Sequence, residues 1–180
     1  MSENNIETMR HSLSHVMAAA IKNLYSDTTT IRFGVGPAIE NGFYYDVDFG
    51  DVKVSDEDLK KIEKEMHKII NKDLPIVYSE KSREEALAWA NENKQKYKRE
   101  LIEDLPENET ISFYTLGKFE DLCKGPHVES TGKVGAFKLE KVAGAYWRGD
   151  EKRKMMTRIY GVSFPKKKML DEYLVMMEEA

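Results

Sequence analysis

The sequence has only one cysteine, and it has no apolar run approaching the eighteen or so residues that a membrane-spanning helix requires. A single cysteine cannot form a disulfide bond within the chain, which favours a reducing compartment, and we predict a cytoplasmic protein. The polar start MSENNIETMR lacks the apolar centre of a signal peptide. Neither of the phosphate-binding patterns GxxxxGKS/T and GxGxxG occurs, so nothing indicates a nucleotide-binding loop. What remains is a globular composition, with 41% hydrophobic and 33% charged residues.

Positive charge is concentrated in one part of the chain. Residues 124–168 carry 12 Lys and Arg against 4 Asp and Glu, whereas the rest carries 16 against 28, and the net charge is −4. The basic segment can present a positive face to a polyanion such as nucleic acid, or it can be a solvated surface without a partner. Charge alone leaves both readings open.

The hydrophobic pattern alternates between helical and extended segments. We expect helices at 5–25, at 55–71, from a capping box that begins at Ser82 to about residue 94, and at 165–178. Strands are expected at 31–35, 43–48, 74–80, 111–117, 119–123, 135–144, 145–149 and 155–164. This order predicts an α+β fold in which a mainly antiparallel sheet packs against long helices. We expect one domain over residues 1–180, with a short leader at 1–7.

Two short motifs hold nearly all of the histidine and cysteine. HSLSH places His11 and His15 one turn apart on the first helix, nearly opposite its apolar stripe, so that the helix should have a core side and a histidine side. DLCKGPH contains Cys123 and His127 around a Gly-Pro bend. Three imidazoles and a thiolate suit tetrahedral zinc, although each motif taken separately is more typical of a hydrogen-bonded or packed residue. Their concentration in two motifs favours one shared site, whereas we expect His67 to be a surface residue.

Longer stretches around these motifs resemble a known family. They are HSLSHVMAAAIKNLY, GVGPAIENGFYYDVD, DLCKGPH and VAGAYWRGDEKRKMMTRIYGVSFP. Over roughly residues 8–175 the chain resembles the amino-terminal editing domain of bacterial threonyl-tRNA synthetases, and the two motifs are shared more distantly with alanyl-tRNA synthetase editing domains. The resemblance implies hydrolysis of serine from mischarged seryl-tRNA(Thr). Such editing is needed because one missing methyl group discriminates by only about 1–3 kcal/mol.

The resemblance also implies which residues form the site. His11, His15, Cys123 and His127 would line the pocket, and Lys98, in KYKREL, would lie near the reacting ester. From its residues alone, Lys98 reads as one exposed lysine among several, and only the resemblance reverses that reading. Asp121 lies two residues before Cys123, so on a strand both would face the same side, and the carboxylate could orient an imidazole or the attacking water.

Three further residues are candidates for tRNA contact. Tyr146 and Arg148, in GAYWRGD, could stack on a base and bind a phosphate of the unpaired 3′ end. The alternative is a strand whose aromatic residues fill the core and whose Arg148 pairs with Asp150, and for Trp147 we predict core packing. Tyr44 should face away from its neighbours on a strand, but the pattern leaves open which side holds the pocket.

The family divides on metal. In the alanyl branch the four motif residues His11, His15, Cys123 and His127 are zinc ligands, whereas the threonyl branch is thought to edit without an obligatory metal. We predict hydrolysis with no required cofactor and keep zinc as the alternative, with Cys123 shaping the pocket rather than acting as a nucleophile.

The expected partners are the tRNA(Thr) 3′ end carrying serine and a synthetase catalytic core, in cis or in trans, with no membrane and no DNA. The helix at 165–180 would lead toward that core, which this sequence lacks, so the chain reads as a synthetase fragment or a free-standing editor that does not aminoacylate by itself. Alternatives are a zinc-dependent alanyl-type editor, a non-catalytic tRNA-binding appendage and a structural zinc module.

Overall fold

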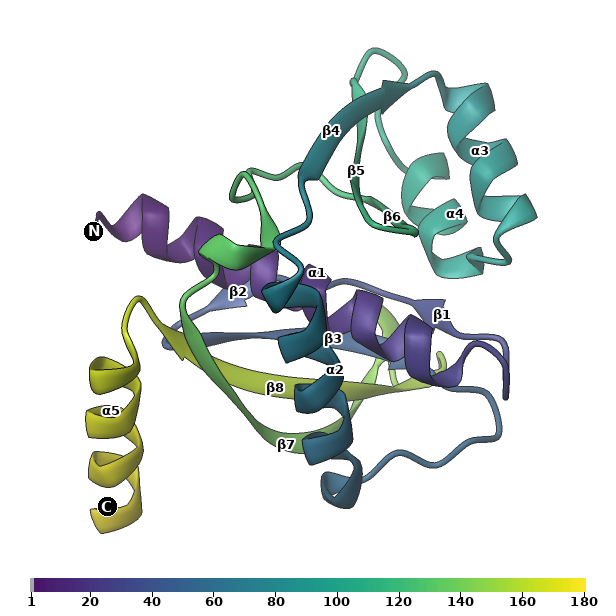
Figure 1. Cartoon of the computed structure of the whole chain (residues 1–180). Coiled ribbons are helices and arrows are strands. Elements are labelled where there is room, and N and C mark those ends of the chain that lie inside the picture. The colour runs from purple at the N-terminus through teal and green to yellow at the C-terminus, as the bar shows by residue number, and fades with distance from the viewer. Residues whose placement is uncertain (1) are drawn as a thin grey trace.

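A long helix, α1 (Glu3–Tyr25), crosses the centre of the molecule between two antiparallel sheets (Figure 1). The computed structural model describes residues 2–180. The larger sheet has the order β1-β3-β8-β7, and β2 also pairs with β3; its strands are β1 (Arg32–Phe33), β2 (Ala38–Ile39), β3 (Gly42–Asp48), β7 (Ala136–Tyr146) and β8 (Met155–Phe164). The smaller sheet has the order β4 (Ile76–Lys81), β5 (Ile111–Leu116) and β6 (Phe119–Leu122). The predicted α+β class with antiparallel pairing is confirmed.

The other helices cover the two sheets separately. The helix α2 (Leu59–Asn71) packs on α1 and β7. Two short helices, α3 (Arg83–Glu92) and α4 (Lys96–Glu103), share a second apolar cluster with β5 of the smaller sheet. The last helix, α5 (Lys167–Glu179), extends from the end of β8 and buries only Leu170 (Figure 1). The molecule therefore has two lobes, and α1 lies where they meet.

Helix α1 is buried on both sides. Its apolar stripe packs in the main core, as the helical spacing predicts, but Ser12, Ser14 and His15 are buried too. Residues of the smaller sheet, including Leu116 and Phe119, join the same core from the opposite side. The histidine side of the helix is therefore covered as well: His15 is only 4% exposed, because the second lobe packs over it. The buried alanines Ala18 and Ala19 leave room for this close packing.

Several boundaries differ from the sequence prediction for local reasons. Helix α1 begins at Glu3, within the predicted leader, because the Ser2 side chain accepts a hydrogen bond from the Asn5 N–H; Met1 lies outside the described residues. The capping box at Ser82 is confirmed. Helix α4 was not predicted at all. The segment 145–149 is wrong as a strand beyond Tyr146, because the chain turns at Trp147–Gly149, where Arg148 has φ 54°. Trp147 is buried, as predicted.

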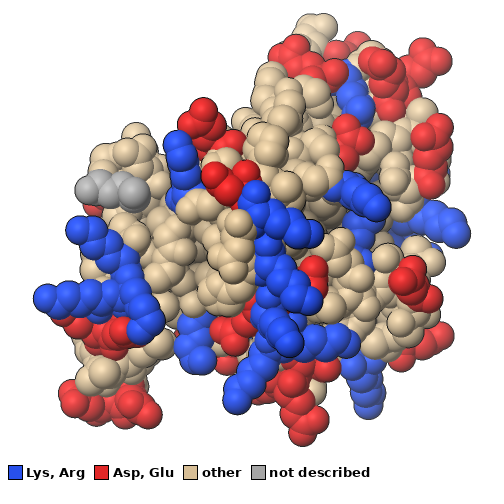
Figure 2. All heavy atoms as spheres, viewed as in Figure 1, with Lys and Arg blue, Asp and Glu red and all other residues tan. Residues whose placement is uncertain are grey.

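The charges gather on different lobes. Figure 2 shows Lys and Arg in a band over the region where α2 and β7 lie in Figure 1, with Asp and Glu more frequent toward α3 and α4. Helix α2, which lies in this region, carries several exposed lysines. The basic face is therefore built partly outside residues 124–168. None of the helices within residues 2–180 combines the length and apolar character needed to cross a membrane.

The close packing between β3 and β8 should make a side chain at Gly161 destabilising. Gly161 lies opposite Phe43, and a Cβ at Gly161 would lie 2.4 Å from Cζ of that ring. Because Phe43 is completely buried, the ring has no space to retreat. We expect Gly161→Ala to lower the free energy of unfolding by about 1–3 kcal/mol, measured by urea unfolding.

Gly144→Ala on the neighbouring strand is the matched control. A Cβ at Gly144 would meet only the Met155 side chain, which is half exposed and can move. Equal losses of stability in the two variants would contradict this account of the β3–β8 packing.

Candidate functional site

A cavity of about 520 Å³ opens between the two lobes. The larger lobe contributes His11 and His15 of α1 and Tyr45 of β3. The second lobe contributes Lys98 of α4 and Cys123, which follows β6. The remaining wall is mixed: Val35, Gly36, Pro37, Leu101, Asp104, Leu105, Thr110, Ile111, Ser112, Leu122, Lys124 and Arg148. The two sequence motifs therefore meet at one place.

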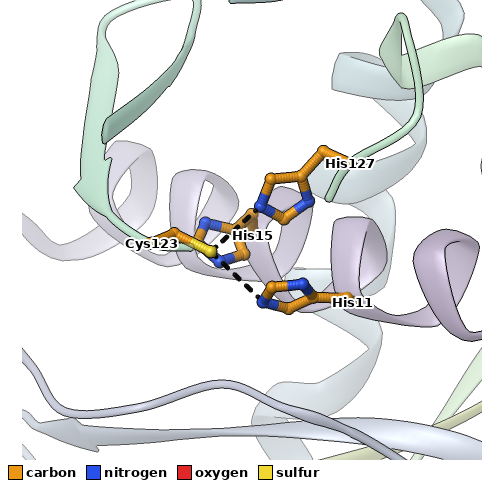
Figure 3. Close-up of side chains that lie close together, drawn as sticks. All are labelled: His11, His15, Cys123 and His127. Atoms are coloured by element: carbon orange, nitrogen blue, oxygen red, sulfur yellow. Dashed lines mark hydrogen bonds between the residues drawn. The ribbon is translucent and has the colours of Figure 1, made fainter. Parts of the chain in front are cut away.

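The histidines and the cysteine form a compact cluster (Figure 3). His11 and His15 reach it from α1, and Cys123 and His127 reach it from the loop after β6. One nitrogen or sulfur atom from each of the four residues lies within 4.8 Å of the others. The Cys123 Sγ lies 3.3 Å from Nε2 of both His11 and His127.

The loop that closes this cluster depends on a glycine. Gly125 has φ 71°, and a Cβ there would lie 2.2 Å from the hydroxyl oxygen of Tyr114. Its N–H donates to the Cys123 Sγ at 3.2 Å. The left-handed conformation and the close approach of Tyr114 both favour glycine, which lets the chain turn His127 back toward Cys123.

The second nitrogen of each imidazole has its own partner. The Ser12 hydroxyl donates to the Thr8 carbonyl at 2.8 Å, so its oxygen accepts from His127 Nδ1 at 3.0 Å. His11 bonds to the backbone of Pro126, which offers only a carbonyl, and His15 Nδ1 lies 3.2 Å from Asp121. These contacts make the second nitrogens the donors, so an Nε2 lone pair of His11 and of His127 points at the sulfur.

This arrangement fits a zinc ion. Three imidazoles and a sulfur are a common tetrahedral donor set, and metal-binding histidines usually donate their other N–H to a carboxylate or a carbonyl, as His15 and His11 do here. His11, His15, Cys123 and His127 would hold the ion. The predicted possibility of zinc is thus compatible with the geometry.

Burial keeps the cluster uncharged near neutral pH. It lowers the pKa of His11, lowers that of His15 well below its ordinary value, and lowers that of His127 to about 2. Burial also raises the pKa of the Cys123 thiol to about 11. Neutral imidazoles can accept a proton, whereas a protonated thiol is a poor nucleophile.

A buried carboxylate connects the cluster to Lys98. Asp121 is 2% exposed and Lys98 is 3% exposed, and Lys98 Nζ lies 3.1 Å from Asp121 Oδ1. Asp121 Oδ2 accepts from the Tyr45 hydroxyl at 2.5 Å and lies 3.2 Å from His15 Nδ1. Lys98 also donates to the Tyr45 oxygen at 2.9 Å. Asp121 therefore orients an imidazole. Lys98 is buried, and is not the exposed lysine that its neighbouring residues alone indicate.

The three candidate tRNA contacts lie in different places. Tyr44 lies on the other face of β3 from the cavity, where the Arg158 guanidinium sits 3.9 Å from its ring centre, so the side that the pattern left open is the side of Tyr45. Tyr146 is 40% exposed and does not line the cavity. Arg148 lines the cavity, and it pairs with Glu100 and Asp104 rather than with Asp150.

Sequence reasoning missed Tyr45 and Ser12. Tyr45 alternates with Tyr44, so the pattern contained the signal for two faces but not for which face meets the cavity. Ser12 lies between the two histidines of HSLSH, one residue after His11. A serine in the middle of a helix, beside histidines, could have been recognised as a partner for one of their rings.

The buried carboxylate of Asp121 should contribute strongly to the stability of the fold. Asp121→Asn leaves the Lys98 ammonium buried without its counterion, so we expect the free energy of unfolding to fall by about 3–5 kcal/mol in urea titrations. Glu120→Gln, at the adjacent and more exposed position of β6, removes only a pair with Lys81 and should cost less than about 1 kcal/mol. Adding Lys98→Met to Asp121→Asn should recover part of the loss. If the two single variants are equally stable, Asp121 does not support the fold as described.

The sequence is similar to those of known proteins. Residues 111–160 match the second additional domain of threonyl and alanyl tRNA synthetases. The chain is 55% identical over 179 residues to threonine–tRNA ligase 1 of Bacillus subtilis (strain 168), 99% of this chain and 27% of that protein. It is 56% identical over 178 residues to the threonine–tRNA ligase of Acetivibrio thermocellus and 57% over 179 to that of Halalkalibacterium halodurans, with the same two coverages.

The chain thus spans about a quarter of the length of these relatives, 27% in each case. Residues 111–160 are thus similar to the second additional domain of threonyl and alanyl tRNA synthetases, and the resemblance of nearly the whole chain to threonyl-tRNA synthetases is confirmed.

Proposed function

We propose that the chain is an editing unit that hydrolyses the ester of mischarged seryl-tRNA(Thr), with the tRNA 3′ end as its partner and a synthetase core in cis or in trans. The observation that carries the proposal is a buried Lys98–Asp121–His15 linkage beside a cavity that His11, His15 and Cys123 of the cluster line; the fourth member, His127, was expected at the pocket but lies behind its wall. The similarity to threonine–tRNA ligases supports an editing role.

Ester hydrolysis needs a positioned water, a proton acceptor and stabilisation of the developing oxyanion. The neutral imidazoles of His11 and His15 line the cavity and can accept a proton from water. His15 is the better oriented of the two, because its Nδ1 is held by Asp121 and its Nε2 is left as the acceptor. An imidazole held in this way by a carboxylate keeps the tautomer that a base requires.

Lys98 supplies the positive charge. An ammonium group has three N–H bonds, and among the described residues Asp121 and Tyr45 accept two of them. The third N–H is available to the ester carbonyl oxygen in the cavity. Burial strengthens this interaction, because water is largely excluded around Lys98. Lys98 would therefore stabilise the oxyanion without first breaking its bond to Asp121.

Cys123 contributes a wall and a proton donor rather than a nucleophile. With the pKa of its thiol raised to about 11, almost no thiolate is present at neutral pH. Together with His11 it narrows the space beside Lys98, which suits selection of an amino acid by size. The difference between serine and threonine is one methyl group, worth about 1–3 kcal/mol where a wall excludes it.

Zinc-dependent hydrolysis of the alanyl type is the second candidate, favoured by the four ligand atoms that lie within 4.8 Å of one another. His11, His15, Cys123 and His127 would hold the ion, and a bound zinc ion would supply Lewis acidity. In that case the chemistry would depend on the metal, and Lys98 would contribute less.

The test is release of amino acid from tRNA(Thr) charged with serine or threonine. We expect serine to be released faster, and we expect Lys98→Ala and His11→Ala to lower kcat/KM on the order of a hundredfold to a thousandfold. Lys96→Ala and His67→Ala are matched controls, because both residues are exposed and neither lines the cavity. A chelator should leave the rate unchanged.

Other outcomes would replace the proposal. Loss of activity with a chelator, together with cleavage of alanine esters, would identify the zinc-dependent editor. Binding of tRNA without release of serine would identify a non-catalytic appendage. If removal of metal unfolds the chain, as measured by circular dichroism, the site is a structural zinc module.

A further inference from the structure

The helix that carries Lys98 is too short to hold its own position. Helix α4 has eight residues, and a helix of that length is marginal in water without tertiary contacts. It follows α3 in the second lobe, but it is fastened to the larger lobe. The Gln95 side chain, just before α4, accepts from the Phe33 N–H and donates to the Ile31 carbonyl, both at 2.9 Å. The Tyr97 hydroxyl donates to Asp48 at 2.7 Å.

A third fastening lies near the other end of the helix. Glu100 accepts from the Trp147 indole N–H at 2.7 Å and from Arg148 Nη1 at 3.2 Å, and it also pairs with Arg153. Partial burial opposes ionisation of Glu100, yet these hydrogen bonds hold its pKa below the ordinary value, so the carboxylate is charged at neutral pH. One side chain thus ties α4 to three residues of the segment between β7 and β8.

The turn that supplies these donors is itself constrained. The Trp147 N–H donates to the Lys154 carbonyl at 2.8 Å, and the Asp150 N–H donates to the Trp147 carbonyl at 3.2 Å. The Trp147 side chain is 1% exposed, so its N–H needs the acceptor that Glu100 provides. Arg148 holds a left-handed conformation, φ 54°, which aims its guanidinium at α4. The turn at Trp147–Gly149 is therefore held rigidly where it meets Glu100.

Glu100 cannot act on the reaction by contact. At about 100° per residue, Lys98 and Glu100 leave the helix roughly 160° apart, so they project from nearly opposite sides. Glu100 also does not line the cavity, whereas Lys98 does. An influence of Glu100 on the reaction can pass through the position of α4 or through Arg148, which pairs with Glu100 and lines the cavity, and only the first route depends on Lys98.

We propose that Glu100 is a positioning residue for the proposed hydrolysis: by anchoring α4 to the turn at Trp147–Gly149, it sets how far the Lys98 ammonium reaches into the cavity. The inference rests on the proposed function. Displacement of a reacting group by about 1 Å can cost a hundredfold in rate. The Glu100 side chain is 31% exposed, so its removal leaves no large core cavity, but the buried Trp147 N–H loses its acceptor, so the unfolding free energy has to be measured beside the rate.

The experiment compares Glu100→Ala with Glu103→Ala in the 180-residue chain. Both residues are glutamates of α4, but Glu103 is half exposed and pairs only with Arg99 on the same helix. With seryl-tRNA(Thr) as substrate, we expect Glu100→Ala to lower kcat about tenfold to a hundredfold with KM changed less than about twofold, and Glu103→Ala to leave both unchanged. Glu100→Gln keeps an acceptor for Trp147 and should retain more of kcat.

A double-mutant cycle tests whether the effect passes through Lys98. In a Lys98→Ala background, Glu100→Ala should cause almost no further loss, because the group that it positions is already gone. Additive losses would overturn the inference. So would an unchanged kcat in Glu100→Ala, or an equal loss in Glu103→Ala. Circular dichroism will show whether Glu100→Ala folds. If it does not, Arg153→Gln removes one of the three partners of Glu100 at an exposed site. It should lower kcat in the same way but by a smaller factor.

A readout independent of activity separates this inference from the proposed function. The Lys98 ammonium is buried and hydrogen-bonded to Asp121 and Tyr45, so its protons should exchange slowly with water. They should therefore give an observable 1H–15Nζ resonance in NMR spectra. Glu100→Ala should shift or broaden that resonance, and Glu103→Ala should not. If the wild-type chain releases no serine but the resonance responds, the proposed function fails and the positioning remains. An active wild type whose resonance ignores Glu100→Ala would overturn the positioning alone.

Discussion

One of the buried carboxylates, Asp121, joins the two lobes at the site. Asp121 meets the Lys98 ammonium, the Tyr45 hydroxyl and the His15 ring, which come from α4, β3 and α1. Removing a carboxylate from water is costly, and three donors on its two oxygens are what offsets the cost. These partners belong to different elements, so the carboxylate keeps its partners only when both lobes are in place. The interaction that assembles the site is therefore also one that joins the lobes.

This dependence explains the unusual environment of α1. A helix at a lobe junction must pack on two sides, and α1 does so with apolar residues on one side and with Ser12, His15, Ala18 and Ala19 elsewhere on its surface. The small residues permit close approach, and the polar ones need partners because water does not reach them. Ser12 finds them in Thr8, His127 and the Val128 N–H. Polar groups that the fold has to satisfy are thereby arranged around the cavity.

Elements with strong local signals could be predicted, and those made by tertiary contacts could not. The apolar period of α1, the strand-forming residues of β8 and the Ser82 capping box are local features of the sequence, and the elements that they predict are confirmed. Helix α4 has no such signal: KYKREL is highly charged, and Lys98 is buried only because Asp121, far along the chain, meets it. Likewise, the alternation of Tyr44 and Tyr45 defines two faces, but only packing decides which one lines the cavity. The convergence of the motifs was inferred from their composition and from the resemblance.

The same physics leaves the cluster able to take either a proton or a cation. Two Nε2 lone pairs, from His11 and His127, point at one Cys123 sulfur, each at 3.3 Å. A neutral thiol has one proton and can satisfy only one of them. The second lone pair then needs a donor, and burial makes protonation of either ring unfavourable. A water molecule can donate to this lone pair. A zinc ion would satisfy all the lone pairs together. One arrangement of residues can thus hold either a proton shared with water or a metal ion, and the thiol must lose its proton in the second case.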